Sequence, residues 1–512
     1  MSILSGEFLL FCFGVLILYY LMPVKARRWV LTLASIAFVA FSGWMSLVHL
    51  TVVALVAWGG SWALVKMQKG RRLMLALTLI LELGSMLLLK FEPSLAEWLN
   101  NFLLTDGAMM FEAWNMEMMP EMISVWDFAL PIGLSYYTFQ ASGYLIDAYR
   151  GKVQVPLDPT RVWLFLGFFP QLSQGPIATW KELNPQLSEG HRLDPDIFVS
   201  GAQLMLWGYF KKMVIADRLA PTTDKLLEGG ELSGWLILLC VALYGIRLYM
   251  DFSGGMNVVR GFSRMLGIEL PLNFKRPFFA QSVADYWRRW HITLGAWFRT
   301  YVLYPLATSH AGIGLGHAAE KLFGKRAGRI LPTALATIPV FLLIGVWHAV
   351  SWNAVIYGGY FGLLMAVSML LDPVWKQMRK KLHLPKDGWM KPIRIIRTLL
   401  IVLLAQYFAF TTDADVSFSL LKGTFANWCF EDAAGQLTGI MTALEWLIAL
   451  IGMVIVLVVD LLCEKKKDVC GGLARGSLLI RWPLMLLLLL TVLIFGVYGT
   501  GYDAQAFLYA QF

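Results

Sequence analysis

The chain has 512 residues, of which 58% are hydrophobic and only 15% are charged, and its mean hydropathy is +0.62. A soluble globular domain carries about 25% charged residues, so this composition excludes that class. The net charge of +9 does not indicate a nucleic-acid partner, because surplus Lys and Arg of membrane proteins gather in cytoplasmic loops. We therefore expect a polytopic protein of the lipid bilayer with helical spans, since the apolar runs exceed the roughly ten residues of a barrel strand.

The positions of basic residues predict the orientation of the N-terminal helices. A first span at about 8–23 ends at a basic group (25–28), a second span returns outward to Ser42, and a third runs inward to a basic group at 66–72. A fourth span leads outward into residues 91–127, which contain acidic residues but no Lys or Arg. A loop without positive charge is typical of the external face, so the N-terminus is expected outside.

The middle of the chain, at about 128–330, is less regular. Prolines and glycines interrupt its apolar stretches, which also carry Gln140, Gln174 and Asp251. Irregular backbone at membrane depth persists only where protein covers it or where it lines a wet cavity. We predict re-entrant segments and short helices around a central funnel, with ordinary interfacial loops as the alternative.

The C-terminal part follows the same charge pattern. The very basic stretch 375–397 is expected in the cytoplasm, and outward and inward spans follow at about 398–410 and 441–462. A basic loop and a last outward span then place the C-terminus outside. We expect about 11 helices in a single domain, 1–512, made of N-terminal helices with the external loop (1–127), a catalytic core (128–372) and C-terminal helices (373–512).

Two tryptophan–histidine pairs, at 290–291 and 347–348, lie in or beside these apolar segments. An ionisable side chain at membrane depth is costly, so it marks a functional site by default. Spans at about 331–348 and 353–371 place His348 toward the outer end of a helix. This position suits a general base that acts on a substrate reached from outside. The alternative is a tryptophan–histidine pair of the interfacial aromatic belt.

The surroundings of the other histidine, His291, are more basic. It follows Arg288 and Arg289, and helical spacing puts Trp287, His291 and Leu294 on one face. An arginine-rich amphipathic segment at the cytoplasmic headgroup boundary explains the arginines equally well. The sequence therefore leaves the role of His291 open.

Other catalytic patterns are missing from the sequence. It contains no Gly-x-Ser-x-Gly elbow, no phosphate-binding glycine loop and no His-Glu-x-x-His helix, so we predict no metal site. His310 and His317 lie in a glycine-rich stretch that we expect to be an exposed loop. A histidine without a covalent nucleophile suits the removal of a hydroxyl proton while that oxygen attacks an acyl carbonyl. The imidazole pKa of about 6.5 permits this near neutral pH.

At these motifs the chain resembles the membrane-bound O-acyltransferase (MBOAT) family. It is similar to the bacterial branch that includes the alginate O-acetylation, peptidoglycan O-acetylation and teichoic-acid D-alanyl transfer proteins. The family's common GLWHG appears here as GVWHA, so Ala349 adds a methyl group beside the histidine. The matching segments run in the family's order, at 130–151, 168–177, 248–278, 286–306 and 345–362.

The resemblance implies an MBOAT-like helical ring with re-entrant segments around a central tunnel. His348 would be the catalytic histidine and general base, and His291 a second active-site residue that orients or polarises the donor carbonyl. The two would meet inside a tunnel that joins the two membrane faces. Further candidates for tunnel lining or substrate contact are Trp347, Trp290, Asn353, Asp251, Gln140 and Gln174.

The resemblance also implies the substrates and partners. We expect no permanently bound cofactor, and a thioester donor that is either acetyl-coenzyme A or a carrier-protein thioester. The acyl group, expected to be acetyl, would reach hydroxyls of an extracellular or cell-wall polysaccharide at a bacterial cell membrane. Residues 91–127 would dock a secreted or membrane-anchored transferase or a small helper protein, or instead form a lid.

Two other functions remain as alternatives. D-alanyl transfer to teichoic acid is the alternative within the family. A polymer exporter or transporter without acyl chemistry is the more distant one, and such a protein would show internal repeats with interrupted helices in both halves. No such repeat is visible in the sequence.

Overall fold

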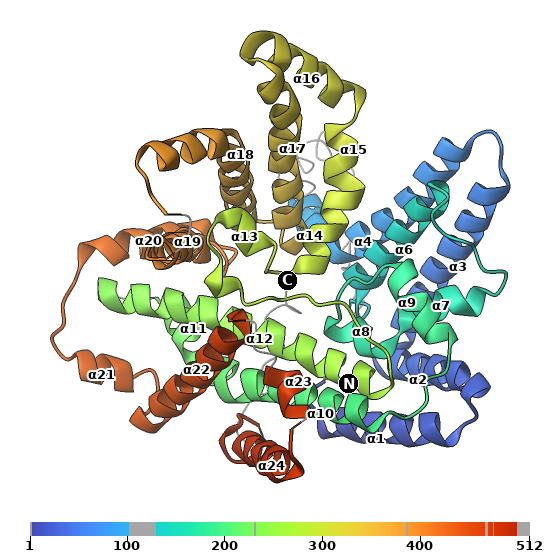
Figure 1. Ribbon diagram of the computed structural model, residues 1–512, viewed down its shortest axis with the longest axis horizontal. Helices are drawn as coiled ribbons and strands as arrows, with labels where there is room; N and C mark the ends of the chain where they lie inside the picture. The colour runs from blue at the N-terminus through green and yellow to red at the C-terminus, as the bar shows by residue number, and fades with distance from the viewer. Residues whose placement is uncertain are drawn as a thin grey trace, which may run out of the picture. The chain divides into compact units, whose positions relative to one another are not determined.

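The computed structural model describes residues 3–101, 130–229, 232–385, 388–465, 469–474 and 476–498. Within these ranges the regular structure is helical and contains no β-strand (Figure 1). The predicted external loop 91–127 lies outside the described residues from position 102 onward. Its proposed role as a docking site or lid therefore stays a prediction.

Seven helices of the described part are long and apolar enough to cross a membrane, which confirms an all-α polytopic membrane protein. The first predicted span forms a shorter apolar helix, α1 (Gly6–Leu21). The second predicted span forms α2 (Arg27–Phe41), and the span predicted at 398–410 forms α19 (Met390–Gln406). The expected total of about 11 spans stays a prediction. The seven are α3 (Trp44–Lys66), α4 (Arg71–Asn101), α12 (Gly234–Met265), α17 (Lys325–His348), α18 (Trp352–Lys381), α22 (Ala443–Glu464) and α24 (Leu478–Phe495).

The chain divides into two compact units, and the first comprises residues 17–173 and 177–190. Its central helix, α6 (Leu134–Tyr149), packs against α3 and α4. Two polar groups on the buried face of α6 have partners inside this unit. The Tyr144 hydroxyl lies 3.0 Å from Ser61 Oγ, and Gln140 donates a hydrogen bond of 3.2 Å to the carbonyl of Ala178.

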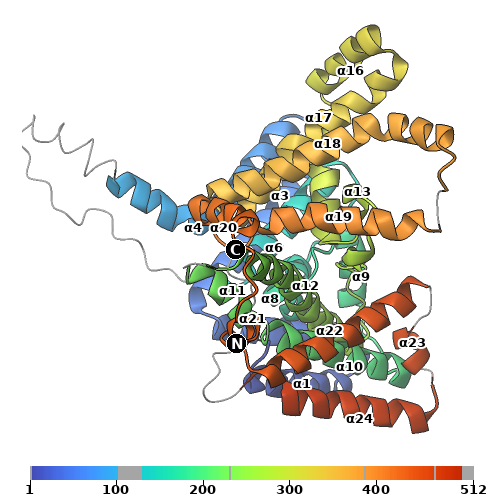
Figure 2. The ribbon, with the colours of Figure 1, turned by 90° about the vertical axis from the view of Figure 1, so that its left-hand side faces the viewer.

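The second unit comprises residues 2–16, 174–176 and 191–512 and is organised around α12. Figure 2 shows α10 (Pro195–Tyr209) beside this helix. The two backbones come close because glycines face each other at the crossing. A Cβ atom on Gly208 would lie 2.6 Å from the carbonyl oxygen of Gly254, and one on Gly261 would lie 2.4 Å from the amide nitrogen of Met205. No larger side chain fits there.

An ion-paired cluster fixes the segment that follows α10. This π-helical segment, η3 (Phe210–Ala216), carries Lys212, whose ammonium group lies 2.5 Å from Asp251 of α12 and 2.7 Å from Asp217. The side chains of all three are at most 4% exposed. Buried charges persist only when they are paired, so this cluster ties η3 to α12.

The glycine-rich stretch around His310 is not the loop that the sequence suggested. It forms α16 (His310–Phe323), in which His310 and His317 are exposed as expected. The Ser309 side chain caps the helix by accepting a hydrogen bond of 3.1 Å from the Gly312 amide. The expectation of a loop was wrong because these glycines serve helix packing: a Cβ atom on Gly316 would lie 3.0 Å from the Gly328 carbonyl oxygen in α17.

Replacing Lys212 by Met should strongly destabilise the second unit. The change leaves Asp217 and Asp251 buried without their shared cation, and breaking a buried pair in this way costs about 3–5 kcal/mol. Thermal unfolding in detergent measures the loss. Lys225→Met is the matched control, because its ion pair with Glu228 is solvent-exposed and such pairs contribute about 1 kcal/mol or less. Equal stability of the two variants would contradict the assignment.

Candidate active site

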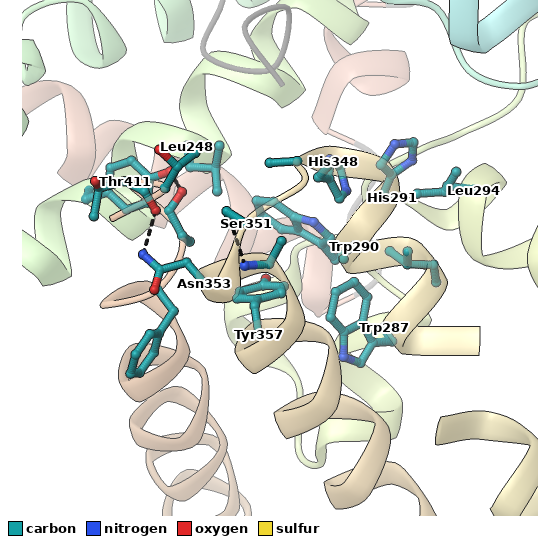
Figure 3. Close-up of a pocket in the computed structure, with 18 residues that line it drawn as sticks. Leu248, Trp287, Trp290, His291, Leu294, His348, Ser351, Asn353, Tyr357 and Thr411 are labelled. Atoms are coloured by element: carbon teal, nitrogen blue, oxygen red, sulfur yellow. Dashed lines mark hydrogen bonds between the residues drawn. The ribbon is translucent and has the colours of Figure 1, made fainter. Parts of the chain in front are cut away.

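Both predicted histidines line one cavity of about 100 Å³ in the second unit (Figure 3). Its walls come from α12, α17, α18, the segment around His291 and residues 408–412. One water molecule needs about 10–15 Å³ of such space, so the cavity holds several waters or a small acyl group. The structure thus brings together two histidines that stand far apart in the sequence.

His348 reaches the cavity from the tip of a helical hairpin. It is the last residue of α17, the chain turns extended at Ala349, and α18 begins after Ser351. The Ser351 hydroxyl caps α18 by accepting a hydrogen bond of 3.2 Å from the Ala354 amide. The helices almost touch near this tip, since a Cβ atom on Gly345 would lie 2.3 Å from the Ala354 carbonyl oxygen. This tight packing fixes the half-buried His348 at the cavity wall.

His291 lies at a break between two short helices, α13 (Val283–Trp287) and α14 (Ile292–Phe298). The helical spacing expected for Trp287, His291 and Leu294 is interrupted, because His291 adopts the left-handed conformation with φ 44° and ψ 53°. Non-glycine residues occupy this region at a cost and mostly where the surroundings impose it. Trp287, His291 and Leu294 still line the cavity together, although the break and not helical spacing brings them there.

Asn273, which the sequence did not single out, imposes this backbone conformation. Its carbonyl accepts a hydrogen bond of 3.0 Å from the Ile292 amide. Its side-chain oxygen accepts hydrogen bonds of 3.0 and 2.9 Å from the amide and hydroxyl of Thr293, and lies 3.3 Å from His291 Nδ1. The first amides of a helix lack partners within that helix, and here Asn273 supplies two of them. Its only sequence signal is its position in the matching segment 248–278.

The surroundings of His291 keep its ring neutral. The residue is 2% exposed, and the Phe252 ring packs edge-on against the imidazole at 4.9 Å between centroids. Burial, and then the charge of His348, hold the pKa of His291 well below its ordinary value of 6.5. His291 lies outside the seven spans. At neutral pH its imidazole therefore carries a basic lone pair and no charge.

Asn353 lines the cavity but acts on the protein itself. Its side-chain nitrogen shares its two N–H groups among three acceptors, the carbonyls of Thr411 and Asp413 at 2.7 and 3.0 Å and Ser417 Oγ at 2.8 Å. These bonds hold segment 411–417 against the first turn of α18. Because Thr411 and Thr412 belong to the cavity wall, Asn353 shapes the site by placing that segment.

The other predicted tunnel residues divide between cavity and scaffold. Trp290 lines the cavity. Trp347 instead packs on the His348 ring at 4.5 Å, and Asp251 pairs with Lys212. Gln140 belongs to the first unit, and the buried Gln174 does not line this cavity. The cavity also includes residues that the sequence did not single out, namely Tyr244, Tyr357, Thr411 and Thr412.

The polar groups that line the cavity include two imidazoles and the hydroxyl groups of Ser351, Thr411 and Thr412. Among the described residues, no group of three or more His, Cys, Asp or Glu side chains has the arrangement of a metal site.

Replacing Asn353 by Leu should release segment 411–417 while leaving both histidines in place. The variant lacks all three donor contacts, so we expect hydrogen exchange of the segment's amides to rise at least tenfold, equivalent to about 1.4 kcal/mol. Thr424→Val is the control. Thr424 lies farther along the same helix, α20 (Ala414–Ala426), and its hydroxyl bonds to Tyr407 at the end of α19, so the change removes no contact to this segment. Unchanged exchange in the Asn353 variant would show that other contacts place the segment.

Comparison with known proteins places this site in context. No protein-family model matches the chain. The chain is 28% identical over 456 residues to the probable alginate O-acetylase of Azotobacter vinelandii, which covers 86% of this chain and 82% of that protein. It is 29% identical over 327 residues to the peptidoglycan O-acetyltransferase of Helicobacter pylori, with 57% and 56% of the two chains covered.

A third relative performs a related transfer. The chain is 27% identical over 287 residues to the teichoic acid D-alanyltransferase of Bacillus subtilis, which covers 54% of this chain and 67% of that protein. All three relatives are acyltransferases by name and members of one family. This chain is accordingly an acyltransferase, and these homologues are members of the membrane-bound O-acyltransferase family.

Proposed function

We propose that this chain moves an acetyl group from a cytoplasmic thioester to hydroxyls of an extracytoplasmic polysaccharide, at a bacterial cell membrane. The observation that carries the proposal is the shared cavity, in which His348 and His291 meet among mostly apolar walls. An imidazole side chain is a suitable general base for acyl transfer near neutral pH. The relatives named above catalyse transfers of this class.

His348 acts as the general base in this proposal. It removes the proton of the acceptor hydroxyl while that oxygen forms a bond to the thioester carbonyl carbon. The carbon–sulfur bond then breaks, and the imidazolium returns the proton to the departing thiolate. Each bond formed is balanced by one broken, so the reaction needs no additional reactant. Among the lining residues, Ser351, Thr411 and Thr412 supply hydroxyl groups that suit the polar acceptor.

The cavity lining favours acetyl over D-alanyl transfer. A D-alanyl group carries an ammonium group, which would need a carboxylate or several acceptors when buried. The lining includes no Asp or Glu side chain among the residues that the structure describes. An acetyl group is small and uncharged, so it fits this surface without such a partner. Acyl esters released from the envelope distinguish the two candidates, since D-alanine among them would contradict acetyl transfer.

The charges of the α17–α18 hairpin support the proposed direction of transfer. α18 starts near His348 and ends with Arg379, Lys380 and Lys381 in its last turn. Basic helix ends prefer the cytoplasm, so the hairpin tip with His348 faces outward. The same rule leads us to propose extracytoplasmic termini. The donor, acetyl-coenzyme A or a carrier-protein thioester, enters from inside, and a secreted or membrane-anchored transferase or helper receives the acyl group outside.

Replacing His348 by Gln should reduce polysaccharide acylation by about 10²–10⁴-fold, because the shape of the side chain is kept while the base is lost. The ester content of purified polymer, normalised to the amount of membrane-inserted protein, measures the effect. His317→Gln serves as the control, since His317 is exposed on α16, away from the cavity. Wild-type acylation by a correctly inserted His348→Gln protein would remove His348 from the mechanism.

A further inference from the structure

We infer that Asn273 is a positioning residue that holds His291 in the tautomer protonated at Nδ1, so that His291 offers an unprotonated Nε2 as a hydrogen-bond acceptor in the cavity. The catalytic consequence of this inference rests on the proposed acyl transfer, whereas the tautomer itself does not. The inference gives His291 a definite role in place of the open one that the sequence left.

The atom of Asn273 that faces His291 is the side-chain oxygen. A side-chain amide presents either an oxygen acceptor or a nitrogen donor, and the two are distinguished by their partners. The atom in question lies 3.0 Å from the backbone nitrogen of Thr293. A backbone N–H can only donate, so this atom must be the oxygen. The side-chain nitrogen then points to the sulfur of Met256 at 3.6 Å, a weak acceptor.

This oxygen determines which nitrogen of the imidazole carries the proton. His291 Nδ1 lies 3.3 Å from this oxygen, which accepts and cannot donate. An unprotonated Nδ1 would set two lone pairs against each other, whereas a protonated Nδ1 donates a hydrogen bond. A neutral imidazole carries one proton, so Nε2 is left with its lone pair. The hydrogen bond made by one ring nitrogen thus sets the chemistry of the other.

This tautomer changes what His291 is able to do. Polarising a donor carbonyl requires an N–H directed at the oxygen, and a neutral His291 has no such group at Nε2. The role expected from the family resemblance therefore fits poorly. An unprotonated Nε2 instead accepts a hydrogen bond, which gives the cavity a second basic nitrogen besides His348.

The choice of an amide at position 273 matters for the charge of the ring. The titratable groups that line the same cavity are His348 on α17, Tyr244 on α12 and Tyr357 on α18. None of them is a carboxylate, and Asn273, at 1% exposure, is itself neutral. The amide orients the imidazole without stabilising its protonated form. An aspartate at the same position would orient it equally but would raise its pKa.

The substitution Asn273→Asp tests this inference by changing charge and leaving shape. The carboxylate keeps all the acceptor contacts, so acyl transfer at pH 8–9 should stay within about tenfold of wild type. The carboxylate also stabilises the imidazolium and so raises the pKa of His291. On acidification the variant should therefore lose activity at a pH about one unit or more above the pH at which wild type loses it. Asn273→Leu removes the acceptor and should lower activity by about 10²-fold. If Asn273 were purely structural, its replacement would lower activity at every pH but would not shift the acidic limb of the pH profile.

Thr293→Val is the matched control. It removes the hydroxyl contact to the same oxygen while the backbone contact remains. We expect activity within about threefold of wild type, from the loss of one hydrogen bond of about 1 kcal/mol or less, and an unchanged acidic limb. An unshifted acidic limb in Asn273→Asp would overturn the inference.

A spectroscopic measurement decides the tautomer without any assay of acyl transfer. Nitrogen-15 NMR of ring-labelled histidine separates protonated from unprotonated ring nitrogens, and the difference from a His291→Gln sample assigns the signals. The wild-type protein and the Asn273→Asp variant should both show a protonated Nδ1, with Nε2 unprotonated in the neutral ring. A protonated Nε2 in neutral wild type would overturn the inference. If the tautomer is confirmed but no variant, including wild type, acylates polymer, the proposed function fails and this assignment stands.

Discussion

Inside a lipid bilayer every backbone polar group must find its hydrogen-bond partner within the protein, and this constraint limits where irregular backbone can lie. Three polar anchors of the second unit meet it. Lys212 ties the π-helical segment η3 to α12, Asn353 ties segment 411–417 to α18, and Asn273 ties the break at His291 to the preceding non-helical segment, 268–274. Each anchor holds an irregular piece of backbone that the apolar environment would otherwise disfavour.

The active site depends on these anchors because it is built from the ends of helices. His348 ends α17, and His291 precedes the first turn of α14. Helix ends expose backbone groups without internal partners, and Ser351 and Asn273 satisfy those next to the cavity. The site therefore gains polar side chains at defined positions without placing an unpaired charge among its apolar walls. A neutral imidazole fits this setting, since burial disfavours its charged form.

The sequence predicted those features that depend on local patterns. Long apolar runs predicted α3, α17, α18 and α22, and the two tryptophan–histidine pairs drew attention to the two histidines that share a cavity. The break at His291 could not be predicted, because its cause lies 18 residues earlier, at Asn273. Asp251 was expected to line a tunnel, but it pairs with Lys212. The two residues stand 39 positions apart, so the sequence did not reveal this ion pair. Long-range polar contacts were the missing information.

We propose that one cavity passes an acyl group from the inner to the outer face of the membrane. The most direct test uses right-side-out membrane vesicles loaded with labelled acetyl-coenzyme A, in the presence of the native external acceptor. Wild-type vesicles should transfer the label to the external polysaccharide, and vesicles with His348→Gln should not. Equal labelling by both, or labelling only when the thioester is supplied outside, would contradict the account.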